Sequence, residues 1–448
     1  MTRRSRRSVL ATLATGVAGG LAGCDQSGGD NGPTPAESPT PDGASTATLT
    51  PTATTTSTAP QTPTAVPAPD LDDPERSGSL IAEGGTSNDG FGAPVAAMGD
   101  RVLVGAALDD TRHGEYAGSV YVFEDDGGWR QATNLRPDDG ADRDRFGAAV
   151  SVSGSRALIG ANGADTDNGP QSGAAYVFER TEGSWTQEAV LVPDDGDRKE
   201  AFGSSVALSS DTAVIGTRDP GEGDPVGTRS VYVFERADGR WRHRTELRSG
   251  HPAETERFAA AVACSRETVF VGATYDDTTD GYESGAVYAF DDRTGSWKQH
   301  EILGKDDATW HAHVGAALDL AGDRLLVGAP GEPKNRKVGA AYVFDRVGDS
   351  WRRRARLAAP DGDDEDRFGD AVALADDTAL VGASGAGRTY HYERTNTGWQ
   401  HRTTLAPNDG ARSWFGSDVA FGPDFTVVGA PADRNRNGHK GGAVVVYS

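Results

Sequence analysis

The side chains best suited to chemistry in this chain are oxygen-bearing residues at alternate positions of short, glycine-containing segments. One segment reads DRNRNG from Asp433 to Gly438, which matches the D-x-[DN]-x-[DN]-G pattern of calcium-binding loops. In that pattern alternate side chains converge on the ion, and the glycine permits a sharp turn. We therefore predict calcium binding by Asp433, Asn435 and Asn437.

Two further segments carry a related set of oxygen ligands. Their candidate calcium ligands are Asp276, Thr278, Asp280, Asp165 and Asp167. The alternative is that Asp, Asn and Gly in these segments form Asx-turns within a hairpin and hold no metal. Both interpretations remain open on the sequence alone.

A pair of histidines, His311 and His313, has the spacing of two side chains on one side of a strand, as two metal ligands can be. The sequence shows no third ligand beside them. It also contains no Gly-x-Ser-x-Gly, no His-Glu-x-x-His and no Cys/His cluster. Because a nucleophile with its base, or a clustered acid pair, is what an enzyme would need, we expect no enzymatic activity.

All of these segments lie in a unit of roughly 56 residues that recurs seven times. Each copy opens with Phe-Gly or its replacement, at Phe91, Phe146, Phe202, Phe258, Val314, Phe368 and Phe415. A Gly-Ala or Gly-Thr pair follows, then a β-rich run such as GSVYVF, and a tryptophan in six copies. Four short strands per copy, divided by turn residues and without helical periodicity, are typical of a propeller blade. We predict an all-β fold, a seven-bladed β-propeller with four-stranded antiparallel blades.

The two ends of the repeat region indicate how the ring closes. The seventh copy stops at Tyr447 after three strands, whereas an extra strand-like segment begins at Ser77. In that segment Leu80 and Ile81 take the place that Leu135 takes before the next Phe-Gly. Since an unpaired edge strand invites aggregation, we predict that the N-terminal strand completes the last blade.

The Phe-Gly and Gly-Ala-Pro landmarks, the latter complete at 328–330 and 429–431, resemble the FG-GAP repeats of integrin α chains and related microbial surface proteins. The resemblance covers about residues 78–448 and implies the same seven-bladed propeller. In that family the loops between the second and third strands bind calcium, so the resemblance favours the metal interpretation. It also implies a binding or adhesion role at the cell surface.

The N-terminus has the features of an export signal. Paired arginines precede a weakly apolar stretch that ends in Leu-Ala-Gly-Cys at Cys24 and is too short to span a membrane. Residues 1–23 resemble a twin-arginine signal joined to a lipobox, which implies cleavage before Cys24 and a lipid on its sulfur. The protein would then be anchored to the outer face of the cytoplasmic membrane. The Thr-, Pro- and Ser-rich composition of residues 24–77 predicts a disordered linker, which leaves 78–448 for the propeller.

The charge of the chain excludes several classes of partner. The formal net charge is −23, and loss of the four arginines of the signal makes it −27. Such a surface repels nucleic acid and anionic lipid, so a lipid on Cys24 would be its sole link to the membrane. With six lysines against 38 arginines the composition resembles that of proteins from salt-loving microbes. We expect a monomer without an intrachain disulfide, because lipidation of Cys24 leaves Cys264 alone.

These observations favour a lipid-anchored surface module whose loops contact a protein or a glycan. The alternative is a structural or assembly component of the cell envelope. A propeller enzyme is a third candidate, because the segment AFDDRTGSW at 289–297 resembles the tryptophan-docking motif of quinoprotein dehydrogenases. The other copies lack that order of residues, which weighs against the enzyme.

Overall fold

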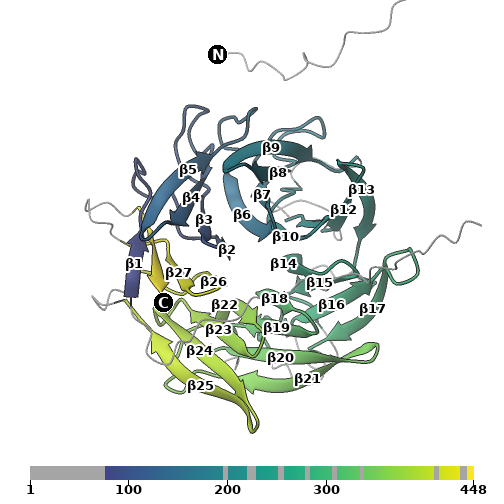
Figure 1. Cartoon of the computed structure of the whole chain (residues 1–448). Helices are drawn as coiled ribbons and strands as arrows, with labels where there is room; N and C mark the ends of the chain where they lie inside the picture. The colour runs from purple at the N-terminus through teal and green to yellow at the C-terminus, as the bar shows by residue number, and fades with distance from the viewer. Residues whose placement is uncertain are drawn as a thin grey trace, which may run out of the picture. The chain divides into compact units, whose positions relative to one another are not determined.

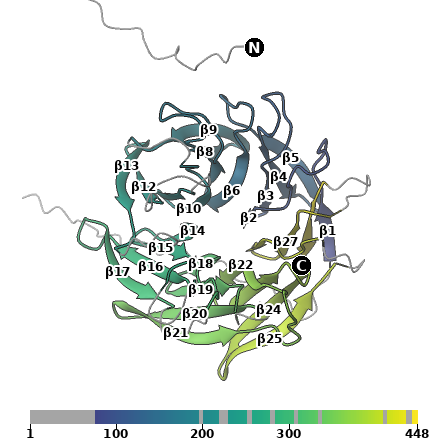
Figure 2. The ribbon, with the colours of Figure 1, turned by 180° about the vertical axis from the view of Figure 1, so that it is seen from behind.

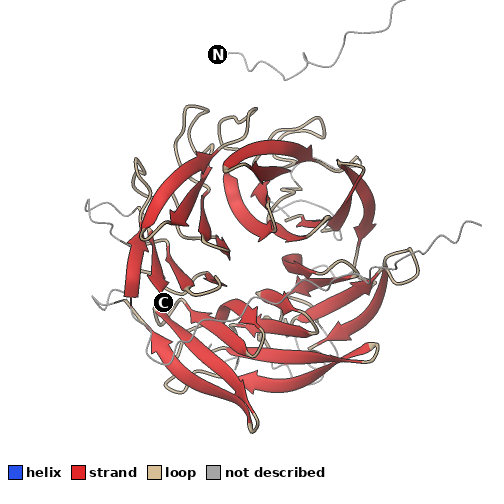
Figure 3. Cartoon of the chain, in the orientation of Figure 1, coloured by secondary structure: helices blue, strands red, loops and turns tan. Residues whose placement is uncertain are grey.

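Seven four-stranded antiparallel sheets, arranged in a ring, make up the domain (Figure 1). The computed structural model describes residues 76–194, 200–218, 229–250, 257–277, 283–304, 310–332, 338–407, 413–433 and 441–448. Within these ranges the regular structure consists of strands and contains no helix (Figure 3). The predicted all-β, seven-bladed propeller is confirmed. Among the described segments there is accordingly no helix of the length and apolarity that a membrane crossing requires.

Each blade contains four strands that follow one another outward from the centre of the ring. The innermost strands are β2 (Val95–Met98), β6 (Phe146–Ser153), β10 (Ser205–Ser209), β14 (Phe258–Cys264), β18 (Leu318–Ala321), β22 (Phe368–Ala375) and β26 (Val419–Phe421). The second strands are β3 (Arg101–Ala106), β7 (Arg156–Ala161), β11 (Thr212–Gly216), β15 (Thr268–Ala273), β19 (Arg324–Ala329), β23 (Thr378–Ala383) and β27 (Thr426–Ala430). The third strands are β4 (Ser119–Asp125), β8 (Ala174–Thr181), β12 (Val231–Ala237), β16 (Ala286–Asp291), β20 (Ala340–Val347), β24 (Arg388–Thr395) and β28 (Ala443–Tyr447). The outermost strands are β5 (Trp129–Leu135), β9 (Ser184–Leu191), β13 (Arg240–Leu247), β17 (Lys298–Leu303), β21 (Ser350–Leu357), β25 (Gly398–Leu405) and β1 (Arg76–Leu80).

The seventh blade combines strands from both ends of the domain. β1 pairs antiparallel with β28, with Ser79 opposite Val445 and Leu80 opposite Val444. Figure 2 shows β1 beside the C-terminal end of the chain. β1 begins at Arg76, two residues before the start predicted for the propeller. The innermost strands β2 and β26 also contact each other, so the first and last blades pack together. Leu80 is buried between these two blades.

The hydrophobic core consists of layers between neighbouring blades rather than one central mass. Seven clusters of buried side chains occur among the described residues, and each combines two adjacent blades. The phenylalanine of each Phe-Gly pair lies in such a layer. Phe146, for example, is fully buried, and its ring packs edge-on against Tyr176 and Phe178, at centroid distances of 5.5 and 5.9 Å. Val314, which replaces phenylalanine in the fifth copy, is equally buried.

The glycines of the two sequence landmarks meet across the blade boundary. A Cβ added at Gly160 in β7 would lie 1.9 Å from the carbonyl oxygen of Gly203, the glycine of the next Phe-Gly pair. Gly203 also has a φ of +89°, in the left-handed region that favours glycine. Both glycines are required because the backbones of adjacent blades touch at this point.

Candidate functional site

The loops of the propeller are divided between two faces. Because the strands of a blade alternate in direction, the first and third strands begin at the same face. We call it the loop face: it carries the loop between the second and third strands of each blade, and the connection from each outermost strand to the next blade. We call the opposite face the hairpin face: it carries two tight hairpins in each of the first six blades and one, between β26 and β27, in the seventh.

In three loops of the loop face, an acidic side chain turns into its blade. Each is buried and accepts a hydrogen bond from a tyrosine hydroxyl on the third strand of the blade. These pairs are Asp109 with Tyr121, Asp276 with Tyr288, and Glu332 with Tyr342. Burial raises the pKa of the Asp109 carboxyl, partly offset by its hydrogen bonds from Ser119 and Tyr121. Asp276, predicted as a calcium ligand, thus lies inside its blade and holds the loop against β16.

In the first, second and fourth blades, an acid of the loop between the second and third strands binds the backbone of its own loop. Asp110, Asp165 and Asp277 each accept the backbone N–H of the residue six positions later, at 2.9, 3.0 and 2.7 Å. These bonds reach six positions along the chain, whereas an Asx-turn returns to the backbone two residues on, so they close the loop without forming the Asx-turn of the metal-free alternative. Asp165 and its neighbour Asp167 are both solvent-exposed. Calcium binding by this pair stays a prediction.

The remaining predicted ligands are placed only in part. Four of them lie outside the described residues, namely Thr278, Asp280, Asn435 and Asn437, and so does the predicted lipidation site Cys24. The backbone N–H of Asp433 donates to Ala430, and its carbonyl accepts from Gly442, at 3.0 and 3.1 Å. Asp276 makes the same two backbone bonds, to Ala273 and Gly285. The described ends of the fourth-blade and seventh-blade loops therefore share one backbone geometry.

The two histidines do not lie in a strand, contrary to the expectation from their spacing. His311 and His313 occupy the connection before β18, both in the left-handed backbone region with φ of +58° and +55°. Their side chains nevertheless come together, and they meet Glu283 from the loop between β15 and β16. Glu283 was missed because it belongs to the preceding copy, 28 residues from His311 in sequence.

Two partly buried carboxylates that line the central channel were also not singled out from the sequence. Asp319 and Asp418 each accept a backbone N–H from the next blade, from Leu374 and Val95, both at 2.7 Å. Burial raises the pKa of each carboxyl to about 6, although these hydrogen bonds act in the opposite direction. The channel, of about 390 Å³, is lined by residues from the innermost strands of all seven blades.

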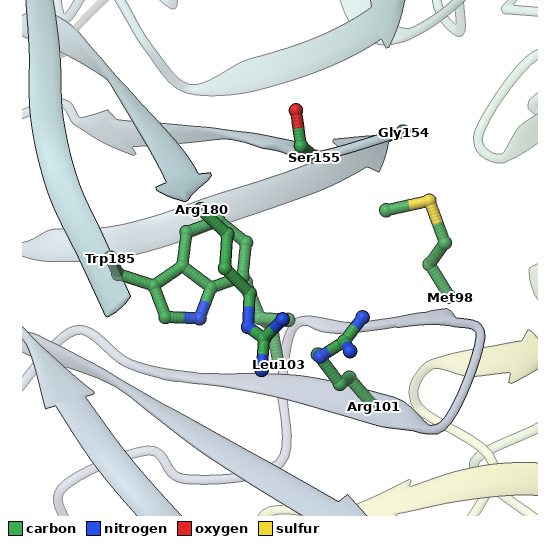
Figure 4. Close-up of a pocket in the computed structure, with 7 residues that line it drawn as sticks. All are labelled: Met98, Arg101, Leu103, Gly154, Ser155, Arg180 and Trp185. Atoms are coloured by element: carbon green, nitrogen blue, oxygen red, sulfur yellow. The ribbon is translucent and has the colours of Figure 1, made fainter. Parts of the chain in front are cut away.

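A smaller pocket of about 200 Å³ lies between the first and second blades at the hairpin face (Figure 4). Its walls include Met98, Arg101, Arg180 and Trp185. The two arginines share Glu124, at 3.3 and 2.9 Å, so one carboxylate joins the two blades. The Nε of Arg180 and the Nε1 of Trp185, both at this pocket, are buried without a hydrogen-bond partner among the described residues.

Large apolar side chains are exposed mainly at the loop face. Trp414 is 64% exposed, Trp310 51% and Tyr116 44%, and Leu108 lies near Tyr116 in the same loop of the first blade. Val347, 47% exposed, lies at a hairpin on the opposite face. The loop face thus presents three aromatic side chains from three different blades.

Sequence comparison matches the FG-GAP repeat at residues 75–123, 129–178, 185–234, 241–290, 351–397 and 399–447. Each match starts near an outermost strand and ends near the third strand of the next blade, and the fifth copy, with its two histidines, has no match. No curated protein sequence matches the chain. Among solved structures it is similar to the β-propeller domain of Cps50 (Swd1) from Myceliophteria thermophila, with a TM-score of 0.51 and 12% identity over 84% of this chain and 99% of that one. That identity supports similarity of fold alone. Because the repeat matches cover more than half of its length, the chain belongs to the FG-GAP repeat family.

Proposed function

We propose that this protein is a lipid-anchored binding or adhesion module of the cell surface, whose loop face contacts a protein or a glycan. The observation that carries the proposal is the collection of exposed aromatic side chains on that face. Tryptophan and tyrosine dominate the energetics of protein interfaces because they bury a large area with few rotatable bonds. Membership in a repeat family with surface-binding members supports the same role.

The aromatic side chains stand on backbone that the ring holds in place. Trp414 directly precedes the fully buried Phe415, and Tyr116 accepts through its backbone carbonyl the N–H of Arg145, next to the buried Phe146. Backbone fixed in this way loses little further freedom when a partner binds. The loop face therefore presents its aromatic side chains on an ordered backbone, which lowers the entropy cost of binding a partner.

Anchoring is proposed to occur through the lipid on Cys24, with residues 24–77 as a spacer. The negative charge of the chain favours a neutral or basic partner and disfavours nucleic acid. Calcium, if bound by the loops around Asp433 or Asp165, would stabilise the same face. In that role it would order loops rather than take part in a reaction.

The test is crosslinking of the full-length protein on intact cells, followed by identification of the partner. The variant W310A/W414A should lose most of the crosslinked product, whereas V347A, on the hairpin face, should retain it. All three proteins should show the same melting temperature, because the substituted side chains are exposed. Equal crosslinking by the double variant and the wild type would contradict a role for the loop face.

A further inference from the structure

The side chains of Glu283, His311 and His313 come together at the boundary between the fourth and fifth blades. Their ligand atoms all lie within 4.8 Å of one another, and His311 Nδ1 is 2.7 Å from Glu283 Oε2. Among the described residues this is the one group of three or more His, Cys, Asp or Glu side chains so placed. Two imidazoles and a carboxylate are the ligand set of many transition-metal centres.

The backbone brings the three residues together through hydrogen bonds between the two blades. The N–H of Val314, next to His313, donates to the carbonyl of Ser284, next to Glu283, at 3.0 Å. Ala312, between the histidines, is fully buried and accepts the N–H of Gly331 at 3.0 Å. The ligand-bearing segments are therefore fixed to each other before any ion binds.

The left-handed backbone at His311 and His313 is general to the ring. In the second blade the same two positions, three residues and one residue before the Phe-Gly landmark, are Arg143 and Arg145, with φ of +64° and +54°. In both copies the two left-handed residues flank one buried residue, and this backbone directs the side chains of both flanking residues outward. The fifth copy differs in chemistry only, because it places imidazoles where the second copy has guanidinium groups.

Neighbouring side chains restrain the histidines and leave one side of the cluster accessible. The ring of His313 stacks on Tyr275, with centroids 5.0 Å apart and planes inclined by 29°. The side chains of His311 and Glu283 are 34% and 18% exposed, so solvent reaches the cluster. A bound ion would keep at least one coordination position open to water or to another molecule.

We infer that Glu283, His311 and His313 form a binding site for a divalent transition-metal cation of the zinc type. Nitrogen ligands select this class over calcium and magnesium, which prefer oxygen. Zinc bonds of about 2.0–2.2 Å place tetrahedral ligands about 3.3 Å apart, so the three side chains need shifts of roughly 1 Å from their present positions. Glu283 belongs to the same fourth-blade loop as Asp276, but the site uses none of the predicted calcium ligands. It also does not depend on the partner proposed for the loop face.

Isothermal titration of the full-length protein with zinc, after treatment with a chelator and desalting, tests the inference. The protein should carry Cys24→Ser and no histidine tag, so that neither contributes a competing site. We expect one zinc ion to bind. Calcium and magnesium should neither produce a binding heat at this site nor weaken the binding of zinc. Cobalt bound in place of zinc should show the visible absorption bands of a site with four or five ligands.

Two variants decide whether these residues are the ligands. H311R/H313R reproduces the residue types of the second blade, so the ring should still fold, with its melting temperature without zinc lowered slightly by loss of the stacking on Tyr275, while zinc affinity falls at least 100-fold. E283Q should weaken binding at least tenfold and alter the cobalt spectrum. Absence of zinc binding by the wild type, or wild-type affinity in either variant, would overturn the site. If zinc has no effect and E283Q only lowers the melting temperature, the His311–Glu283 contact is a structural hydrogen bond alone.

Discussion

Removing the charge of the two channel carboxylates should stabilise the propeller at neutral pH. Asp319 and Asp418 have folded-state pKa values of about 6, against 3.8 for an unperturbed aspartate. The native state therefore holds these protons more strongly than the unfolded state does. Each protonated carboxyl therefore stabilises the native state relative to the unfolded state. This stabilisation is fully present below about pH 4 and is lost as the pH rises through about 6. A difference of two pKa units corresponds to about 3 kcal/mol for each carboxyl at neutral pH.

The variants D319N and D418N keep an oxygen that can accept the N–H of Leu374 or Val95, and they cannot ionise. The amide NH2 cannot accept the second backbone N–H, from Leu320 or Val419, which costs about 1–2 kcal/mol at every pH. Each variant should therefore raise the free energy of unfolding by about 1–2 kcal/mol near pH 7.5, and its difference from the wild type should fall by about 3 kcal/mol towards pH 4. Because the charge of Asp319 itself raises the pKa of Asp418, the double variant should gain less than the sum of the two.

Denaturant unfolding followed by tryptophan fluorescence, at one salt concentration and a series of pH values, measures these differences. D126N, at an exposed hairpin residue, is the control and should track the wild type at every pH. Other acids titrate in all the proteins, so the difference between variant and wild type is the quantity to compare. A difference that does not change with pH, or a variant less stable than the wild type at pH 7.5, would refute the argument from burial.

Four further predictions concern the ring, its loops and its charge. G160A should destabilise the domain by about 2–3 kcal/mol or more in thermal melts, because its Cβ would meet the carbonyl of Gly203; a change below about 0.5 kcal/mol would mean that the blades separate easily. Deletion of residues 78 to 85 removes Leu80 and most of β1, and should abolish the single cooperative melting transition of the whole ring. If the deleted protein keeps that transition, β1 stabilises the seventh blade alone and not the ring. Calcium should raise the melting temperature and a chelator reverse it, while D433A should lose the response; if no shift occurs, the loops are closed by their own hydrogen bonds without a metal ion. Transfer from molar to millimolar salt should lower the melting temperature, because the Debye length grows from about 3 Å to tens of ångströms and exposes the self-repulsion of the acidic chain.

The fold was predictable because its determinants recur at every copy. A buried phenylalanine such as Phe146 and a glycine such as Gly160 occupy fixed positions in the unit, and their repetition identifies the blade. The role of the glycines could not be predicted in the same way. Gly160 contacts Gly203 in the next copy, and only the ring geometry brings these two backbones together.

The candidate ligands were harder to assign because they lie where strand periodicity ends. In a strand, alternation predicts which face each side chain occupies. Asp276 lies instead in a turn, where its backbone N–H donates to the carbonyl of Ala273, and its side chain is buried in the blade. A signal for this role existed in the sequence. Asp109 and Asp276 each precede a tyrosine of the third strand by 12 residues, and that shared spacing marks an internal hydrogen bond.

The fifth copy shows how one repeat can acquire chemistry of its own while the ring is preserved. Val314 fills the place of phenylalanine and remains fully buried, so the packing between the fourth and fifth blades survives the substitution. The positions on either side of the buried Ala312 point outward, and their side chains can change without disturbing that packing. His311 and His313 are such changes, and Glu283 joins them from a different copy. In a propeller of this family, functional residues are therefore to be sought at the outward positions flanking the buried landmark, in the copies that depart most from the repeat.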